Sequence, residues 1–152
     1  MPDDLTFMMG KYPARLPAAL LYARNHMWCR SSDGLLRFGF TSYAVRLMQD
    51  VYFLDWCVDT GAPVELKQRI GNIETSKAVA DLFAPVAGVV LRFNNELLKD
   101  PSAINVDNHG PGWLFEMTGE ANGLMVPSAY HDFLAAGWEN TQRMLKGEIN
   151  RE

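Results

Sequence analysis

The stretch IETSKAVADLFAPVAG, residues 73–88, decides the fold that this sequence predicts. It places one lysine, Lys77, between two apolar runs that are rich in strand-forming residues, with small residues beside it. We expect residues 70–74 and 79–83 to form the arms of a hairpin and residues 75–78 its turn. A turn lysine extends into water on a flexible stem, so an enzyme can reach its amine and acylate it, which removes its charge.

Short runs of strand-forming residues recur through the rest of the chain, separated by turns rich in Gly, Pro, Asn and Asp. These runs occupy residues 26–30, 35–40, 51–56, 89–93 and 113–117. Apolar residues at helical spacing predict one long helix at 128–146. The pattern predicts a mainly β fold, a flattened barrel-sandwich with short helices and a C-terminal helix. We expect residues 1–25 to be an irregular N-terminal arm packed on the body, with a short helix at 20–25, and residues 26–152 to form a single domain.

Composition excludes several classes of function. A net charge of −4 without a basic patch argues against nucleic acid as a partner. No apolar run is long enough to span a membrane, and Pro17 interrupts the one N-terminal segment that resembles a leader, so we expect a cytoplasmic protein. Scattered histidines and the lack of Cys-x-x-Cys spacing argue against a metal site. The lack of a Gly-x-Ser-x-Gly motif or a phosphate loop argues against an independent enzyme.

Several motifs occur in a fixed order around Lys77. They are His26-x-Trp28, Gly39-Phe40-Thr41-Ser42-Tyr43-Ala44, Glu74-x-x-Lys77-Ala78, Asp81-Leu82-Phe83-Ala84-Pro85-Val86-x-Gly88 and Gly110-x-Gly112-Trp113-Leu114. An ordered set of this kind is far more specific than a single motif. It resembles the lipoyl carriers of the glycine cleavage H-protein family. The resemblance implies a non-catalytic carrier domain at residues 26–152, with lipoate amide-linked to Lys77 by a lipoate ligase that recognises the turn with the help of Glu74.

Two other interpretations of the lysine remain open. Biotin carriers also attach their cofactor to a hairpin lysine but usually flank it with methionines, whereas Ser76 and Ala78 flank Lys77, which favours lipoate. The chain could also be an unmodified β-sandwich interaction module. If the lipoyl group is present, it supplies the chemistry, and the protein supplies placement and tethering.

Departures from the family pattern bear on the pathway. The N-terminal arm is longer than usual, Met27 and Cys29 replace the Glu and Val of His-Glu-Trp-Val, and Trp56-Cys57-Val58 stands where Leu-Pro and an acid are usual. These features resemble H-protein-like lipoate-binding proteins of sulfur oxidation, and they favour a swinging arm that shuttles a thiol-bound intermediate. The partners would then be a heterodisulfide-reductase-like complex and a dihydrolipoamide dehydrogenase.

The alternative pathway is glycine cleavage, in which the arm carries the aminomethyl group between glycine decarboxylase and aminomethyltransferase. Cys29 and Cys57 are candidate redox thiols that exchange with the arm, or else small apolar residues of β-strands.

Overall fold

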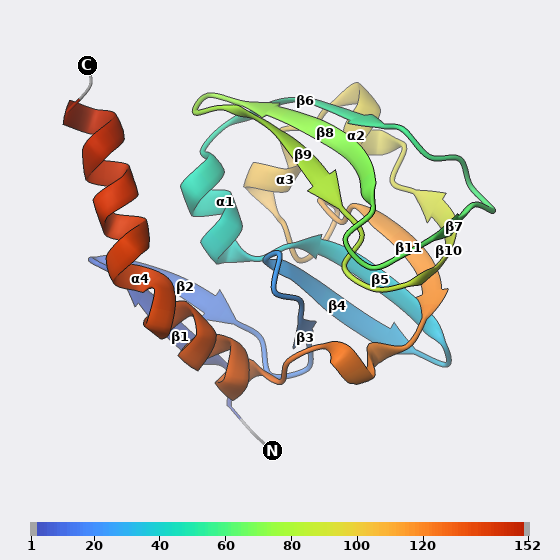
Figure 1. Ribbon diagram of the computed structural model, residues 1–152, viewed down its shortest axis with the longest axis horizontal. Coiled ribbons are helices and arrows are strands. Elements are labelled where there is room, and N and C mark those ends of the chain that lie inside the picture. The colour runs from blue at the N-terminus through green and yellow to red at the C-terminus, as the bar shows by residue number, and fades with distance from the viewer. Residues whose placement is uncertain (1–2, 151–152) are drawn as a thin grey trace.

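The computed structural model describes residues 3–150 and the side chains of residues 3–144. Two antiparallel sheets face each other across a common core (Figure 1). The larger sheet has the order β3 (Leu21–Tyr22), β4 (Met27–Ser32), β5 (Leu35–Phe40), β11 (Phe115–Gly119), β10 (Gly88–Phe93) and β7 (Pro63–Val64). The smaller sheet has the order β6 (Val51–Trp56), β8 (Arg69–Thr75) and β9 (Val79–Phe83). This arrangement confirms the predicted mainly β, flattened sandwich.

Alternation of apolar and polar residues along the strands builds the core. In β5 the buried Leu36 and Phe38 face inward while Arg37 faces outward, as the two-residue period of a strand requires. From the smaller sheet, Leu54 and Ile73 pair across strands and face the same core. Burial of these apolar side chains between the two sheets drives their association.

Within residues 3–150, three short α-helices lie between strands, and a 3-10 helix lies between the last strand and the C-terminal helix. They are α1 (Ser42–Met48), α2 (Glu96–Lys99), α3 (Ala103–Val106) and the 3-10 helix η1 (Ala121–Gly123). Thr41 caps α1, because its side-chain oxygen accepts a hydrogen bond from the Ala44 N–H at 3.2 Å. The C-terminal helix α4 (Pro127–Asn150) is longer than the predicted 128–146. None of the helices in residues 3–150 is long and apolar enough to cross a membrane.

The N-terminal segment differs from the irregular arm that the sequence predicts. It forms a hairpin of β1 (Leu5–Met9) and β2 (Tyr12–Leu16), with Gly10 at a φ of 63° in the turn. Pro13 lies within β2, opposite Met8, and is accommodated there because a two-stranded sheet consists only of edge strands. The predicted short helix at 20–25 is also wrong, because this segment contains β3 and turns.

The hairpin β1–β2 packs on α4 and forms a second core with it (Figure 1). Its inward residues alternate along both strands, and α1 and the start of α4 complete the cluster. The buried members are Phe7, Met9, Ala14, Leu16, Leu20, Tyr22, Trp28, Tyr43, Tyr130 and Leu134. This second core fixes α4 against the side of the sandwich.

Candidate functional site

The turn between β8 and β9 presents Lys77 to solvent on a rigid base. The Thr75 N–H donates to the Ala78 carbonyl at 2.9 Å. The Thr75 hydroxyl oxygen accepts from the N–H groups of Lys77 and Ala78, at 3.2 and 3.3 Å. These bonds hold the backbone of the turn while the Lys77 side chain stays exposed.

Ser76 ties the turn to the neighbouring strand. Its N–H donates to the carbonyl of Asp50 at 2.9 Å, and its hydroxyl accepts from the Asp50 N–H at 3.3 Å. Asp50 directly precedes β6, so the hairpin tip is fastened to the adjacent edge of the sheet. Thr75 and Ser76 were not predicted as positioning residues, although threonine and serine often form side-chain hydrogen bonds to turn backbone. Asp50 takes part through its backbone groups, which no local sequence pattern reveals.

The Lys77 amine is chemically available. Among the described side chains, residues 3–144, no ion pair involves Lys77. An exposed primary amine on a stiff turn is the group that an acyl-transferring enzyme needs to form an amide. The residues present therefore fit a covalently attached acyl cofactor such as lipoate.

Glu74 lies on the outer face of the smaller sheet, close to the turn. It pairs with Val79 on β9 and with Phe53 on β6 in one cross-strand row. Val79 is 70% exposed and Phe53 is 43% exposed, so the carboxylate sits between two apolar side chains on an open surface. This position leaves Glu74 accessible to an approaching enzyme.

A small apolar cleft of ≈ 210 Å³ adjoins the lysine. It lies among the end of α1, the hairpin tip and the distal half of α4. Its lining consists of Leu47, Met48, Ile73, Thr75, Lys77, Ala78, Ala80, Thr141 and Met144. An apolar group attached to Lys77 thus has an apolar surface within its immediate surroundings.

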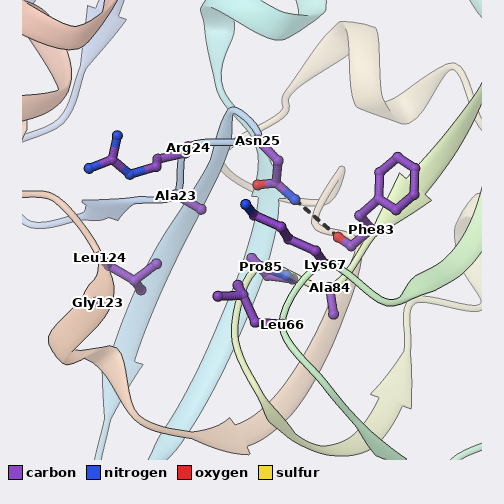
Figure 2. Close-up of a pocket in the computed structure, with 10 residues that line it drawn as sticks. All are labelled: Ala23, Arg24, Asn25, Leu66, Lys67, Phe83, Ala84, Pro85, Gly123 and Leu124. Atoms are coloured by element: carbon purple, nitrogen blue, oxygen red, sulfur yellow. Dashed lines mark hydrogen bonds between the residues drawn. The ribbon is translucent and has the colours of Figure 1, made fainter.

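A larger cavity of ≈ 450 Å³ lies at the opposite end of β9 (Figure 2). Asn25 donates from its side-chain nitrogen to the Phe83 carbonyl at 3.0 Å on one side of this cavity. The Lys67 side chain reaches across it above Leu66 and Pro85, as Figure 2 shows. Lys77 does not line this cavity. The size of the cavity is therefore no reason to regard it as the site where a cofactor is attached.

The two cysteines have different environments. Cys29 on β4 is fully buried, and burial raises the pKa of its thiol to about 12. Cys57 is exposed, and its sulfur lies 3.8 Å from a guanidinium nitrogen of Arg69. A buried thiol with a raised pKa is a poor nucleophile, so the environment of Cys29 argues against the predicted redox role and favours a small apolar core residue.

His26, the first residue of the quoted motifs, is part of the packing under α4. Its Nδ1 lies 2.9 Å from the Tyr130 hydroxyl, which also lies 3.0 Å from the hydroxyl of Thr41. Burial lowers the pKa of His26 to about 4, so its ring is neutral at pH 7. Within the described residues, no group of three or more His, Cys, Asp or Glu side chains could hold a metal ion.

A flattened β-sandwich with a lysine at an exposed hairpin turn defines the class of swinging-arm carrier domains. The model of the family described as "Glycine cleavage H-protein" matches residues 20–136. The chain therefore belongs to the glycine cleavage H-protein family. Members of this family are non-catalytic carriers with lipoate covalently attached to a lysine.

Individual relatives agree with the family match. The chain is 37% identical to a glycine cleavage system H protein of Mycolicibacterium vanbaalenii over 114 residues, which are 74% of this chain and 86% of the relative. It is 35% identical to one of Chromobacterium violaceum over 122 residues, 77% of this chain and 94% of the relative. The crystal structure of a glycine cleavage system H protein from Mycobacterium marinum superposes with a TM-score of 0.68 at 29% identity, covering 80% of this chain and 98% of that chain.

These comparisons support the glycine-cleavage alternative better than the sulfur-oxidation interpretation. Three of the residues that depart from the family pattern have structural surroundings that account for them. Met27 and Cys29 are buried, and Trp56 stacks on Phe93 with ring centroids 4.7 Å apart. Packing in the core accounts for the side chains at these positions, whereas Cys57 is exposed.

Proposed function

We propose that this chain is the lipoyl carrier of a glycine cleavage system, with lipoate amide-linked to Lys77 and the aminomethyl group as its cargo. The observation that carries the proposal is the rigid turn that exposes the Lys77 amine. The partners are then a lipoate ligase, glycine decarboxylase and aminomethyltransferase. Both cysteines are free, which fits a reducing cytoplasm.

The chain's own residues supply a fixed base for a mobile arm. Thr75 and Ser76 hold the turn, and the four-carbon stem of Lys77 adds reach without loosening the sandwich. When bound, the lipoyl group supplies the dithiol that accepts and releases the cargo. The tether keeps this group at a high effective concentration beside each partner that docks on the hairpin.

Glu74 completes the proposed attachment site as the side chain that the ligase recognises. Its carboxylate lies on the outer face of β8, between Phe53 and Val79. A ligase that binds this row needs a cation for the carboxylate and an apolar surface on either side of it.

Reconstitution with a purified glycine decarboxylase tests the pathway. The lipoylated protein is expected to support the exchange of labelled bicarbonate into the carboxyl group of glycine, and the variant Lys77→Arg is expected to give none. Lys67→Arg is the matched control, because Lys67 is an exposed lysine outside the hairpin turn. Absence of exchange with a fully lipoylated protein, under conditions where an established H-protein supports it, would contradict the assignment to glycine cleavage.

A further inference from the structure

A row of charged side chains crosses the outer face of the larger sheet. Arg30 of β4 lies opposite Arg37 of β5, and Arg37 in turn lies opposite Glu116 of β11. On the far side of β11, Glu116 lies opposite Arg92 of β10. Directly opposite residues of antiparallel strands point to the same face of a sheet. Because the four residues come from four strands, the sequence alone indicated no basic patch.

A β-bulge in β10 brings Arg92 into this row. Val90 lies opposite Met117 of β11, and the next pair is Arg92 with Glu116, so Leu91 is the extra residue. A bulge changes the direction in which the side chains beyond it point. Without the bulge, the apolar Leu91 would lie opposite Glu116 in place of a cation.

Two indole rings hold the guanidinium groups in position. The guanidinium carbons of Arg37 and Arg92 lie 4.4 and 5.3 Å from the ring centroid of Trp113. That of Arg30 lies 5.4 Å from the ring centroid of Trp28, which is fully buried. Cations are attracted to the faces of such rings. The arginine side chains therefore lose less conformational freedom when a ligand binds them.

The terminal amino groups of these arginines are free within residues 3–144. Glu116 accepts hydrogen bonds only from the Nε atoms of Arg37 and Arg92, one on each carboxylate oxygen. No described side chain forms an ion pair with Arg30, although Arg30 faces the like charge of Arg37. Like charges directly opposite each other on a sheet are destabilising. An anion that binds across this pair relieves the repulsion.

We propose that this row docks an extended acidic segment of a partner protein. Neighbouring strands are about 4.8 Å apart, so the row from Arg30 to Arg92 spans about 14 Å. An extended chain advances about 3.3 Å per residue, so acidic residues at positions i, i+2 and i+4 cover about 13 Å along one side. Each carboxylate can then accept two parallel hydrogen bonds from one guanidinium group.

Other anions fit the row less well. Proteins that bind single-stranded nucleic acid stack its bases on open aromatic rings. Here Trp28 is buried, and two guanidinium groups lie over Trp113. A free phosphate ion is too small to reach all three arginines. The chain also has a net charge of −4, which disfavours a densely charged polyanion.

The position of the row suits a docking surface on a carrier. The row belongs to the larger sheet, whereas the β8–β9 hairpin with Lys77 belongs to the smaller sheet across the core (Figure 1). A partner bound to the outer face of the larger sheet therefore leaves the lysine turn uncovered. The inference goes beyond the proposed function and does not depend on the attachment of lipoate.

Titration of the ¹⁵N-labelled protein with a short synthetic peptide tests the inference. The probe is acetyl-Glu-Ala-Glu-Ala-Glu-amide, used at low ionic strength because salt screens exposed charges. The Nε–H signals of Arg30, Arg37 and Arg92 and the indole N–H signal of Trp113 are expected to shift until they saturate. The backbone N–H signal of Lys77 is expected to stay in place.

Variants of two exposed arginines give a matched comparison. Arg30→Gln is expected to weaken peptide binding about threefold, and it keeps the Glu116 ion pairs intact. Arg24→Gln is the control, with no change expected. Like Arg30, Arg24 is exposed and has its guanidinium group over an aromatic ring, 5.6 Å from the centroid of Phe133, but it lies outside the row.

Three further probes define the outcomes that would overturn the inference. A peptide with glutamine in place of glutamate is expected to cause no saturable shift, and an equal response to it would exclude recognition of carboxylates. Equally tight binding of inorganic phosphate would show a general anion site, and tighter binding of oligothymidylate would assign the row to nucleic acid. Equal affinity of the Arg30 variant and the unaltered protein for the acidic peptide would also contradict the inference.

Discussion

Tyr22 of β3 and Tyr130 of α4 stack face to face, with ring centroids 4.7 Å apart and ring planes within 2° of parallel. Both side chains are fully buried. The contact joins the edge strand of the larger sheet to the start of the C-terminal helix. The stack therefore anchors the start of α4, whose distal residues Thr141 and Met144 line the cleft beside Lys77.

Removal of the Tyr130 hydroxyl tests the polar side of this junction. Tyr130→Phe keeps the ring stack but leaves the buried hydroxyl of Thr41 and the Nδ1 of His26 without this partner. We expect a loss of about 1–2 kcal/mol in the free energy of unfolding, measured by urea denaturation. Tyr52→Phe is the control, because Tyr52 is 64% exposed, and its loss is expected to be within about 0.5 kcal/mol.

The half-buried His26 makes the stability of the protein depend on pH. Its pKa is about 4 in the folded protein and 6.5 in the unfolded chain, so between these values only the unfolded chain takes up the proton. This contribution to stability is complete above pH 6.5 and is lost as pH falls towards 4, with a slope of up to about 1.4 kcal/mol per pH unit. His109, whose pKa burial also lowers, adds a second contribution in the same direction.

Urea denaturation between pH 7 and pH 4.5 measures this slope. His26→Asn is expected to flatten it and to be tolerated locally, because His26 has a φ of 68° and asparagine accepts left-handed backbone well. An unchanged slope in this variant would show that His26 does not titrate as described.

Glu116 is a buried carboxylate held between two arginines. Arg37 donates to it at 2.9 Å, and Arg92 donates to its other oxygen. Burial acts to raise the pKa of this carboxyl, but the two hydrogen bonds and charges outweigh it and keep the pKa below its usual value. Glu116→Gln leaves both guanidinium groups without their countercharge and is expected to cost about 2 kcal/mol, since partial exposure of the arginines limits the loss. The exposed Glu120→Gln is the control in the same denaturation experiment, with little change expected.

Substitution by alanine at two glycines is expected to change the stability of the protein in opposite directions. A Cβ at Gly39 would lie 2.4 Å from the ring of Trp28, which is fully buried and cannot move aside. Gly39→Ala is therefore expected to destabilise by about 2–3 kcal/mol. Gly137 lies in α4 with open space at the same point, so Gly137→Ala is expected to stabilise by about 0.5–1 kcal/mol. Thermal unfolding of both variants measures the difference, and equal shifts would contradict the packing around Trp28.

The sequence predicted the sandwich and the lysine hairpin because both depend on local signals. Alternation along 79–83 and the small residues at the turn are visible without any knowledge of distant contacts, and Leu82 is buried while Val79 and Phe83 are exposed as alternation requires. The burial of side chains at the distal end of α4 was harder to predict from the sequence. Met144 belongs to the apolar spacing that predicts the helix at 128–146, but its side chain is 69% exposed. The side chain of Leu145 lies outside the described part of the structure.

Other features depended on contacts between distant segments. The β1–β2 hairpin is stabilised because Phe7 and Met9 pack in one core with residues of α4. The sequence around Pro13 contains no local pattern that predicts this contact. The apolar cleft joins α1, the hairpin tip and α4, so only the folded chain reveals it. The sulfur-oxidation interpretation used Met27, Cys29, the stretch Trp56-Cys57-Val58 and the longer N-terminal arm. Met27 and Cys29 are buried in the core, a setting that the sequence alone does not reveal.

The most direct test of the central claim is the intact mass of the protein after incubation with a lipoate ligase, ATP and lipoate. The unaltered chain is expected to gain one lipoyl increment, and peptide mapping is expected to place it on Lys77. Lys77→Arg is expected to gain none, while Lys67→Arg gains one as the unaltered chain does. An increment on the Lys77 variant, or none on the unaltered chain with a ligase that modifies an established H-protein, would contradict Lys77 as the attachment site.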